Sequence, residues 1–470
     1  MRHAHTADQI RSAEAALMAT QPAGALMQQA AAGLAATCAD FMDGVYGKRI
    51  LVLVGAGNNG GDAMYAGARL ARRGALVSAV LLADSVRPEA LRAFRHAGCW
   101  VLDPPSDATA LEGVELVIDG IVGIGGQPGL REPAARIVEQ LSVPAVAVDA
   151  PSGIGVDTGE ISGPHVKADL TVTFGTFKVG LLVDPAASAA GSVELIDIGL
   201  SPYLGEPAVE ALEPADVRRK LPWPDRSAHK YSRGVVAIAA GSPQYTGAGL
   251  LVTSAAVAAG FAGMVRYDGA SADLVRSALP EVVIGTGRAQ AWVVGSGVGD
   301  GQGELVGRIL AEGLPTVVDA DGLTYLPARC VGPTVLTPHA GELARMLGAQ
   351  REEVEARMLR AATAAARRWQ SVVVLKGPRT VIAAPDGRVR VNCTGVAWLA
   401  TAGAGDVLAG VIGTLLAAGL DCFDAASLGA WLHGTAAELA SRAVGCDASG
   451  PITASSLVSS LPAAIRSVCR

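Results

Sequence analysis

Short apolar runs alternate with longer stretches of helix-forming residues in the first part of the chain. The runs contain few polar side chains, which predicts strands that are buried on both faces. Strands are expected at 51–54, 77–83, 169–175, 179–183 and 193–200, and within 114–130 and 145–153. Helices are expected at 6–19, where Thr6 and Gln9 form a capping box, and at 24–41, 63–73, 88–97 and 131–141. This alternation predicts a doubly wound, Rossmann-like α/β domain with a parallel sheet.

The alternation resumes after a change of composition. Residues 206–227 are rich in proline and polar side chains, and we expect them to link a domain at 1–205 to a second domain at 228–470. In the second domain, strands are expected within 229–249, 291–299, 315–323, 334–342, 371–384 and 388–393. Helices are expected at 248–260, after a turn at 401–406, at 424–443 and at 453–468. The second domain is therefore also predicted to be α/β.

One long uncharged stretch, Val235 to Val265, has to be weighed as a membrane span. Ser242, Pro243 and Gln244 interrupt it, and alanine and glycine dominate the residues that follow. Such residues favour a strand, a polar turn and a buried helix over a membrane span. No membrane partner is therefore expected.

Composition narrows the classes of function. The chain has 470 residues, 50% of them hydrophobic, which is enough for two or three domains. Its net charge is −6 and it has no run of basic residues, so no nucleic-acid partner is expected. The 7 cysteines form no C-x-x-C pair, which argues against a disulfide or zinc framework. Because the first residues lack an apolar signal core, we expect a cytoplasmic protein.

The most polar turn between a strand and a helix is GAGNNGGD, residues 55–62. Its glycines would let backbone N–H groups approach a phosphate at a helix N-terminus. The pattern G-x-G-x-x-G alone fits a purely structural turn equally well. The two asparagines and Asp62 favour a binding site, because a structural turn needs only one such side chain. Since Asp119 and Asp149 also follow predicted strands, three carboxylates are expected at the carboxyl edge of one sheet.

A second glycine turn, residues 401–406, ends in Asp406 and precedes a long apolar helix. Its N–H groups could hold a phosphoryl group while Asp406 takes a proton from an attacking hydroxyl, as phosphoryl transfer requires. Lys376, at the end of a predicted strand, could meet nucleotide phosphates or be a surface lysine of a hairpin. His339 could contact a ligand or lie beside a helix N-cap. The 7 histidines show no metal-binding spacing, so metal is expected only as an ion carried with nucleotide.

Several segments resemble a known family. In the second domain these are 229–242, 295–299, 319–323, 336–342, 373–382 and 401–410, which resemble the ribokinase-like NAD(P)H-hydrate dehydratases. In the first domain 55–62, 118–130 and 149–159 resemble the NAD(P)H-hydrate epimerases. Both sets, in this order over nearly the whole chain, resemble the bifunctional NAD(P)H-hydrate repair enzymes.

The resemblance implies a reaction for each domain. Water adds across the nicotinamide C5–C6 double bond of NADH and NADPH and gives R and S epimers at C6. The first domain would interconvert these hydrates, NADHX and NADPHX. The second would convert the S form back to the nucleotide with ADP or ATP as co-substrate, releasing AMP or ADP and phosphate.

The resemblance also implies residue roles in the epimerase. The hydrate would contact Asn58, Asn59, Gly60, Gly61, Asp62, Gly123, Ile124, Gly125, Gly126, Gln127, Pro128, Gly129 and Asp149. A potassium ion would be held by Asn59, Asp119 and Ser152. Oxygen ligands suit an alkali cation, which agrees with three acids around one sheet edge. Our hypothesis is that Asp62 or Asp149 acts as general acid/base for loss and re-addition of the C6 hydroxyl.

In the dehydratase, the hydrate would contact Ala248, Gly297, His339 and Asp406, and the nucleotide would contact Lys376, Gly377, Pro378, Arg379, Thr380 and Gly405. Magnesium would accompany the nucleotide. Asp406 would deprotonate the C6 hydroxyl for attack on the terminal phosphoryl group, and elimination of phosphate would restore the double bond.

The chain departs from the common family pattern at four positions, Ala63, Ser296, Gly322 and Ala404. At each of them one small residue replaces another, which affects fine specificity.

Two alternatives remain at this stage. A vitamin-precursor kinase resembling the hydroxyethylthiazole or hydroxymethylpyrimidine kinases shares the glycine turn and its aspartate, and would use the first domain as an accessory. Alternatively, the first domain is a catalytically silent binding module, against which the retention of Asp62, Asp119 and Asp149 argues. We expect a homo-oligomer; the sequence leaves open the choice between ADP and ATP and between NADHX and NADPHX.

Overall fold

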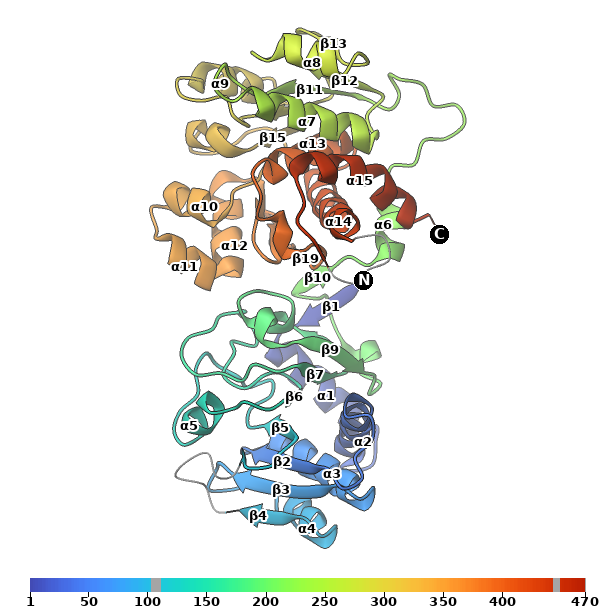
Figure 1. The fold of residues 1–470 in the computed structure, drawn as a ribbon, viewed down its shortest axis with the longest axis vertical. Coiled ribbons are helices and arrows are strands. Elements are labelled where there is room, and N and C mark those ends of the chain that lie inside the picture. Colours follow the sequence, from blue (N-terminus) through green and yellow to red (C-terminus); the bar gives the residue numbers. More distant parts are fainter. Residues whose placement is uncertain (103–110, 443–448, 470) are drawn as a thin grey trace. The chain divides into compact units, whose positions relative to one another are not determined.

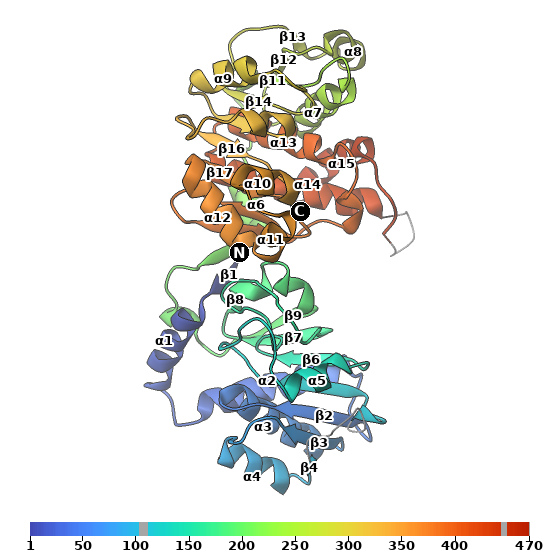
Figure 2. The same cartoon turned by 90° about the vertical axis from the view of Figure 1, so that its left-hand side faces the viewer.

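The computed structural model describes residues 1–102, 111–442 and 449–469. It divides into two compact units, His3–Val209 and Met1–Arg2 with Glu210–Arg470. Figures 1 and 2 show both units as sheets covered by helices.

The N-terminal unit contains a parallel sheet in the order β4-β3-β2-β5-β6-β7-β9. The strands are β2 (Arg49–Val54), β3 (Leu76–Leu81), β4 (Trp100–Leu102), β5 (Leu116–Gly120), β6 (Ala145–Val148), β7 (Leu170–Phe174) and β9 (Ser192–Ile196). Outside this sheet, β1 (Arg2–His5) pairs in parallel with β8 (Phe177–Lys178). The doubly wound parallel sheet that the apolar runs predicted is therefore confirmed.

Helices cover both faces of this sheet, as the apolar character of its strands requires. They are α1 (Ala7–Met18), α2 (Ala25–Phe41), α3 (Asn58–Arg72), α4 (Pro88–His96) and α5 (Ala134–Glu139), with 3-10 turns η2 (Val179–Leu181), η3 (Ala186–Ala189) and η4 (Ser201–Tyr203). Along β2, Val52 packs into the core under α2, α3 and α4, whereas Leu53 packs into the core under α5. The capping box predicted for the first helix is present at Thr6.

One predicted strand of this unit is wrong. Residues 179–183 contain no strand, and the first three of them form the 3-10 turn η2 (Val179–Leu181). The Gly180 N–H donates to the carbonyl of Val156 over 2.7 Å, outside any strand pairing. A short apolar run marks burial but does not distinguish a strand from a buried turn.

The C-terminal unit holds a sheet whose strands follow the order β13-β12-β11-β14-β15-β16-β17-β18-β19-β10. The bounds are β10 (Val209–Ala211), β11 (Val235–Ala239), β12 (Met264–Tyr267), β13 (Val283–Ile284), β14 (Ala291–Val294), β15 (Thr316–Val318), β16 (Thr334–Leu336), β17 (Val372–Leu375), β18 (Thr380–Ala383) and β19 (Val389–Asn392). Pairing is parallel from β13 to β17, and β18 is antiparallel to both β17 and β19.

The helices of this unit pack an extensive apolar core against the sheet. They are α6 (Pro214–Lys220), α7 (Thr246–Ala259), α8 (Ala272–Ala278), α9 (Gly303–Ala311), α10 (Ala340–Leu347), α11 (Arg351–Ala356), α12 (Met358–Trp369), α13 (Ala404–Ala417), α14 (Cys422–Ser441) and α15 (Ala454–Ser467), with 3-10 turns η5 (Ala320–Tyr325) and η6 (Ala397–Leu399). The predicted helix 424–443 corresponds to α14, and residue 443 lies outside the described residues. The stretch Val235 to Val265 forms β11, a turn, α7 and part of β12, and none of the described helices is long and apolar enough to cross a membrane.

The segment 206–227, expected as a linker, carries β10 and α6. Val217 and Leu221 of this segment are buried in the core of the C-terminal unit. Pro214 occupies the first turn of α6 and Glu213 caps it. Proline is favoured at the first position of a helix as well as in linkers, so composition alone did not reveal the helix.

Candidate active sites

The first candidate site lies where β2 ends and α3 begins. Gly57 adopts a φ of 86° and precedes Asn58, so residues 58–62 form the first turn of α3. A methyl group at Gly55 would overlap the carbonyl oxygen of Ile121, which follows β5. The turn after β2 therefore packs directly on the loop after β5, and any larger residue at position 55 would separate them.

Replacing Gly55 with alanine is expected to destabilise the N-terminal unit by about 1–3 kcal/mol, because overpacking against backbone forces the loops apart. Chemical denaturation of the purified protein measures this change. The matched control is Gly205→Ala, since nothing lies within 4 Å of a methyl group there. We expect the control to stay within about 0.5 kcal/mol of the wild type, and equal stability of both variants would contradict the packing described here.

Asp119, in β5, is fully buried and holds the loops after β5 and β6 together. Its Oδ2 accepts the N–H of Ser152 over 2.8 Å, and its Oδ1 accepts the Ser152 hydroxyl over 2.6 Å and the Ile121 N–H over 3.2 Å. Burial raises the pKa of Asp119 to about 6, although these hydrogen bonds act in the opposite direction. No ion pair to Asp119 is present among the described residues.

A cluster of charged side chains lies at the same edge of the sheet. Lys178, only 1% exposed, forms an ion pair with Asp149 and also donates to Thr173 Oγ1 over 2.8 Å. Asp149 itself adopts a φ of 68°. Burial, with the nearby charges of Asp149 and Glu14, raises the pKa of Asp62 well above its usual value. Burial and Asp149 likewise raise the pKa of Glu14 in α1.

The surroundings of Gly123 show that Asn59, from the first turn of α3, lies close to Asp149, which follows β6. A methyl group there would come 2.7 Å from Asn59 Oδ1 and 3.3 Å from Asp149 Oδ2. The Nδ2 atom of Asn59 and the Oδ1 atom of Asp62 are buried without a hydrogen-bond partner. Asn58 is placed differently, because its Oδ1 accepts from Arg87. Two buried polar atoms are thus left for a ligand beside the Asp149–Lys178 pair.

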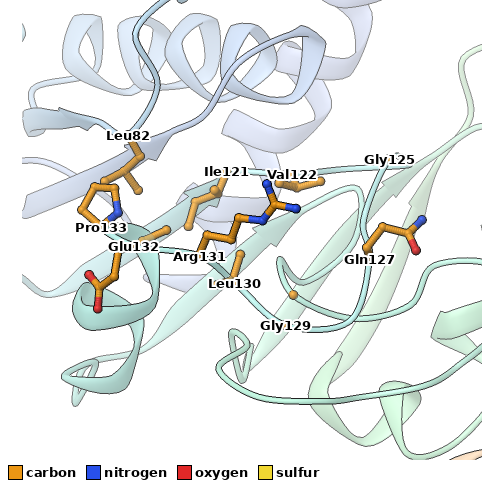
Figure 3. Close-up of a pocket in the computed structure, with 12 residues that line it drawn as sticks. Leu82, Ile121, Val122, Gly125, Gln127, Gly129, Leu130, Arg131, Glu132 and Pro133 are labelled. Atoms are coloured by element: carbon orange, nitrogen blue, oxygen red, sulfur yellow. The ribbon is translucent and has the colours of Figure 1, made fainter.

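The remaining residues of the loop 123–129 lie outside this charged cluster. Gly125, Gln127 and Gly129 line a cavity of about 300 Å³, shown in Figure 3. Ile124 packs against the core under α3, and Gly126 lies against Val156 and the Ile154 carbonyl. The loop therefore connects the Asn59–Asp149 region to a separate cavity.

The second candidate site lies at the start of α13. Gly403 has a φ of 85°, and α13 begins at Ala404, which places Gly405 and Asp406 in its first turn. Asp406 is half-buried, and burial together with the charge of Asp319 raises its pKa to about 7. A carboxylate with a pKa close to neutrality, beside the N–H groups of a helix N-terminus, suits proton transfer next to an anion.

Lys376 follows β17 and points to this helix end. Its Nζ lies 2.9 Å from Asp319 Oδ1 and 3.9 Å from Glu342 Oε2, and a methyl group at Gly405 would be 3.2 Å from it. Burial lowers the pKa of Lys376, but the charges of Asp319 and Glu342 outweigh this effect and raise it overall. Lys376 does open the hairpin turn between β17 and β18, but it is not an exposed surface lysine, because its side chain is only 22% exposed and pairs with Asp319.

Three other predicted residues lie around these groups. His339 is the N-cap of α10, since its Nδ1 accepts the N–H groups of Gly341 and Glu342, and its side chain is 55% exposed. A methyl group on Gly297 would lie 2.7 Å from the Cβ of Ala248, so these two predicted hydrate contacts adjoin each other. The predicted nucleotide contacts 376–380 form the turn between β17 and β18, with Thr380 opening β18.

The pKa of Asp406 makes the second site sensitive to pH. A carboxyl group acts as a base only when it is deprotonated, so we expect the kcat of a reaction that uses Asp406 as its base to fall as the pH is lowered through about 7. The fall should approach tenfold per pH unit below that value. A kcat profile between about pH 5 and pH 9 measures it, and a flat profile would argue against Asp406 as the base.

Several charged groups at both sites were not predicted from the sequence. Lys178, Glu14 and Arg87 were not singled out in the first, and Asp319 and Glu342 were not singled out as partners of Lys376 in the second. A lysine inside the otherwise apolar stretch 177–183 was the available signal for Lys178. Among the described residues, no group of three or more His, Cys, Asp and Glu side chains could hold a metal ion by itself.

Two family models match the chain. A family model described as NAD(P)H-hydrate dehydratase matches residues 236–458, and one described as YjeF-related protein N-terminus matches residues 23–180. The bifunctional NAD(P)H-hydrate repair enzyme of Mycobacterium leprae is 44% identical over 486 residues, covering 99% of either chain. That of Mycobacterium tuberculosis is 46% identical over 448 residues, covering 91% of this chain and 92% of its own.

A solved structure of an NAD(P)H-hydrate dehydratase is similar to the C-terminal unit. The ADP/ATP-dependent NAD(P)H-hydrate dehydratase from Bacillus subtilis, co-crystallized with ATP/Mg²⁺, matches with a TM-score of 0.51 and 30% identity, covering 55% of this chain and 99% of that chain. The fold and sites define a two-unit α/β enzyme whose C-terminal unit is ribokinase-like. The chain belongs to the family of bifunctional NAD(P)H-hydrate repair enzymes.

Proposed function

We propose that the two units of this NAD(P)H-hydrate repair enzyme carry successive steps on one substrate. The N-terminal unit interconverts the R and S hydrates at C6, and the C-terminal unit dehydrates the S form with ADP or ATP. The observation that carries the proposal is Asp406 in the first turn of α13, beside the Lys376–Asp319 pair, in a chain that also has the Asp62–Asp149–Lys178 cluster.

In the epimerase unit, Asp62 acts as the proton donor to the C6 hydroxyl. Its raised pKa keeps a proton on the carboxyl group, and its unpartnered Oδ1 is free to meet a ligand. The C6–O bond breaks as the ring nitrogen lone pair moves into the N1–C6 bond and water leaves. Water then adds to the other face of C6 and returns its proton to Asp62. Asp149, paired with Lys178, orients the substrate beside Gly123.

A potassium ion fits the residues next to this cluster. Asp119 is a fully buried carboxylate without an ion pair among the described residues, and Ser152 and Asn59 add oxygen donors. Buried charges are normally paired or bound to a metal ion. We propose that Asn59, Asp119 and Ser152 hold potassium, which would supply a positive charge for the buried carboxylate.

In the dehydratase unit, Ala248, Gly297, His339 and Asp406 contact the S hydrate, and residues 376–380 with Gly405 contact the nucleotide. Asp406 takes the C6 hydroxyl proton while that oxygen attacks the terminal phosphoryl group, and AMP or ADP leaves. The C6–O bond of the phosphorylated hydrate then breaks and C5 loses a proton, which yields NAD(P)H and phosphate. Magnesium would enter with the nucleotide and offset phosphate charge, and Lys376 meets the same charge from the protein.

Product analysis tests the dehydratase proposal directly. Incubation of S-NADHX with ADP or ATP and magnesium should yield one free phosphate for each NADH that forms. A vitamin-precursor kinase would leave the phosphate on its product, so a phosphorylated product without free phosphate would overturn the proposal. The cytoplasmic location and the homo-oligomeric state stay predictions, and gel filtration with light scattering tests the latter.

A further inference from the structure

We propose that the cavity in Figure 3 receives the adenosine end of the hydrate and that Arg131 binds the 2′-phosphate that distinguishes NADPHX from NADHX. This inference rests on the proposed epimerase function, because it extends the binding site of that unit to the far end of its substrate. It assigns to Arg131 a specificity role that the resemblance does not imply.

The loop 123–129 determines which end of the substrate enters the cavity. Gly123, at one end of the loop, lies beside Asn59 and Asp149, where the nicotinamide ring reacts in the proposed function. Gly129, at the other end, lines the cavity together with Gly125 and Gln127. A dinucleotide that follows the loop from Gly123 therefore brings its non-reacting end, the adenosine, to the cavity.

The walls of the cavity suit a flat, mostly apolar ring. Leu82 after β3, Ile121 and Val122 after β5, and Leu130 and Pro133 before α5 supply apolar surface. A volume of about 300 Å³ lies at the small end of ligand pockets, which fits part of a dinucleotide better than the whole molecule. The carboxyl ends of β3 and β5 flank the cavity, and in open α/β sheets ligands bind at such a crevice.

Three backbone N–H groups of the cavity are already hydrogen-bonded within the protein. The Val122 N–H donates to Ser152 Oγ over 2.9 Å, the Gly129 N–H to the Gly153 carbonyl over 2.8 Å, and the Leu130 N–H to the Pro164 carbonyl over 2.8 Å. These three N–H groups are therefore not available to a phosphate in the cavity.

Arg131 is the cationic side chain that lines the cavity. Figure 3 shows its guanidinium group extending toward Ile121 and Val122, while the carboxylate of Glu132 points the other way. Glu132 is engaged elsewhere, since its Oε2 lies 3.3 Å from Arg136. A guanidinium forms paired hydrogen bonds with a phosphate, which suits Arg131 to the 2′-phosphate of NADPHX.

Epimerase kinetics of the full chain with NADHX and NADPHX test this inference. We expect Arg131→Ala to raise the KM for NADPHX by about tenfold, the usual loss for one charge-assisted hydrogen-bonding group, and to leave the KM for NADHX within about twofold. Arg95→Ala is the control, because this exposed arginine of α4 does not line the cavity. It should leave both KM values unchanged.

Two results would overturn the inference. An equal rise in KM for both hydrates would show that Arg131 binds the pyrophosphate, which both hydrates share. An unchanged KM for NADPHX would show that Arg131 does not contact the substrate. Arg131→Gln, which keeps a hydrogen-bonding side chain of similar length, gives the deciding comparison if the alanine variant does not fold. A wild-type protein that epimerises neither hydrate would instead contradict the proposed function itself.

Discussion

Replacing Asp406 with asparagine is expected to lower the kcat of the dehydratase by about 10²–10⁴-fold, the usual contribution of a general base. The amide keeps the shape of the side chain and its place in the first turn of α13, but it cannot accept the C6 hydroxyl proton. The formation of NADPH from S-NADPHX with ADP or ATP measures the loss. The KM values should change little, because the substrate and nucleotide contacts remain.

The epimerase activity of the same protein is the internal control for this variant. Asp406 lies in the unit Glu210–Arg470, whereas the epimerase cluster lies in His3–Val209, so epimerisation should be unchanged. A second control is Asp321→Asn, which alters a nearby carboxylate that accepts the Gly299 N–H over 3.1 Å. An Asp406→Asn protein with full dehydratase turnover would show that another group takes the proton.

Replacing Lys178 with methionine is expected to destabilise the N-terminal unit by about 3–5 kcal/mol and to abolish epimerisation. Methionine keeps the length of the side chain but removes the ammonium group that pairs with Asp149, and a buried charge left without its partner is costly. Urea denaturation followed by epimerase activity measures the change. Dehydratase activity should persist.

The double variant Lys178→Met/Asp149→Asn separates the ion pair from simple packing. Removing both charges should recover most of the lost stability, since replacing both partners of a buried pair is far milder than removing one. Its epimerase activity should stay low, because Asp149 no longer meets the substrate as a carboxylate. A single Lys178→Met variant as stable as the wild type would contradict the role of the pair.

The edge of the first sheet illustrates what the sequence can predict. Asp119 and Asp149 each follow an apolar run and Asp62 follows the glycine turn, and the carboxyl ends of parallel strands meet at one edge. The structure places Asn59, Gly123 and Asp149 together there, and it pairs Asp119 with Ser152. Local patterns were sufficient because each residue lies at the end of a strand, in the loop after it or in the first turn of a helix.

The lysines that pair with the buried aspartates could not be predicted from local sequence patterns. Lys178 lies 29 positions from Asp149, and Lys376 lies 57 positions from Asp319, so their pairing depends on how the strands are ordered in the sheet. The order itself, with β2 between β3 and β5, does not follow from the periodicity of any one segment. The helix α6 was missed for a related reason, because its burial arises from contacts with distant parts of the core.

The central claim is that one chain repairs both hydrate epimers. Its most direct test follows the near-ultraviolet absorbance of reduced nicotinamide after the full protein meets an equilibrated R and S mixture with ADP or ATP, magnesium and potassium. Full recovery of NADPH is predicted, because the epimerase converts the R form as the dehydratase consumes the S form. Recovery that stops when the S form is exhausted would contradict the epimerase role, and no recovery with either nucleotide would contradict the dehydratase role.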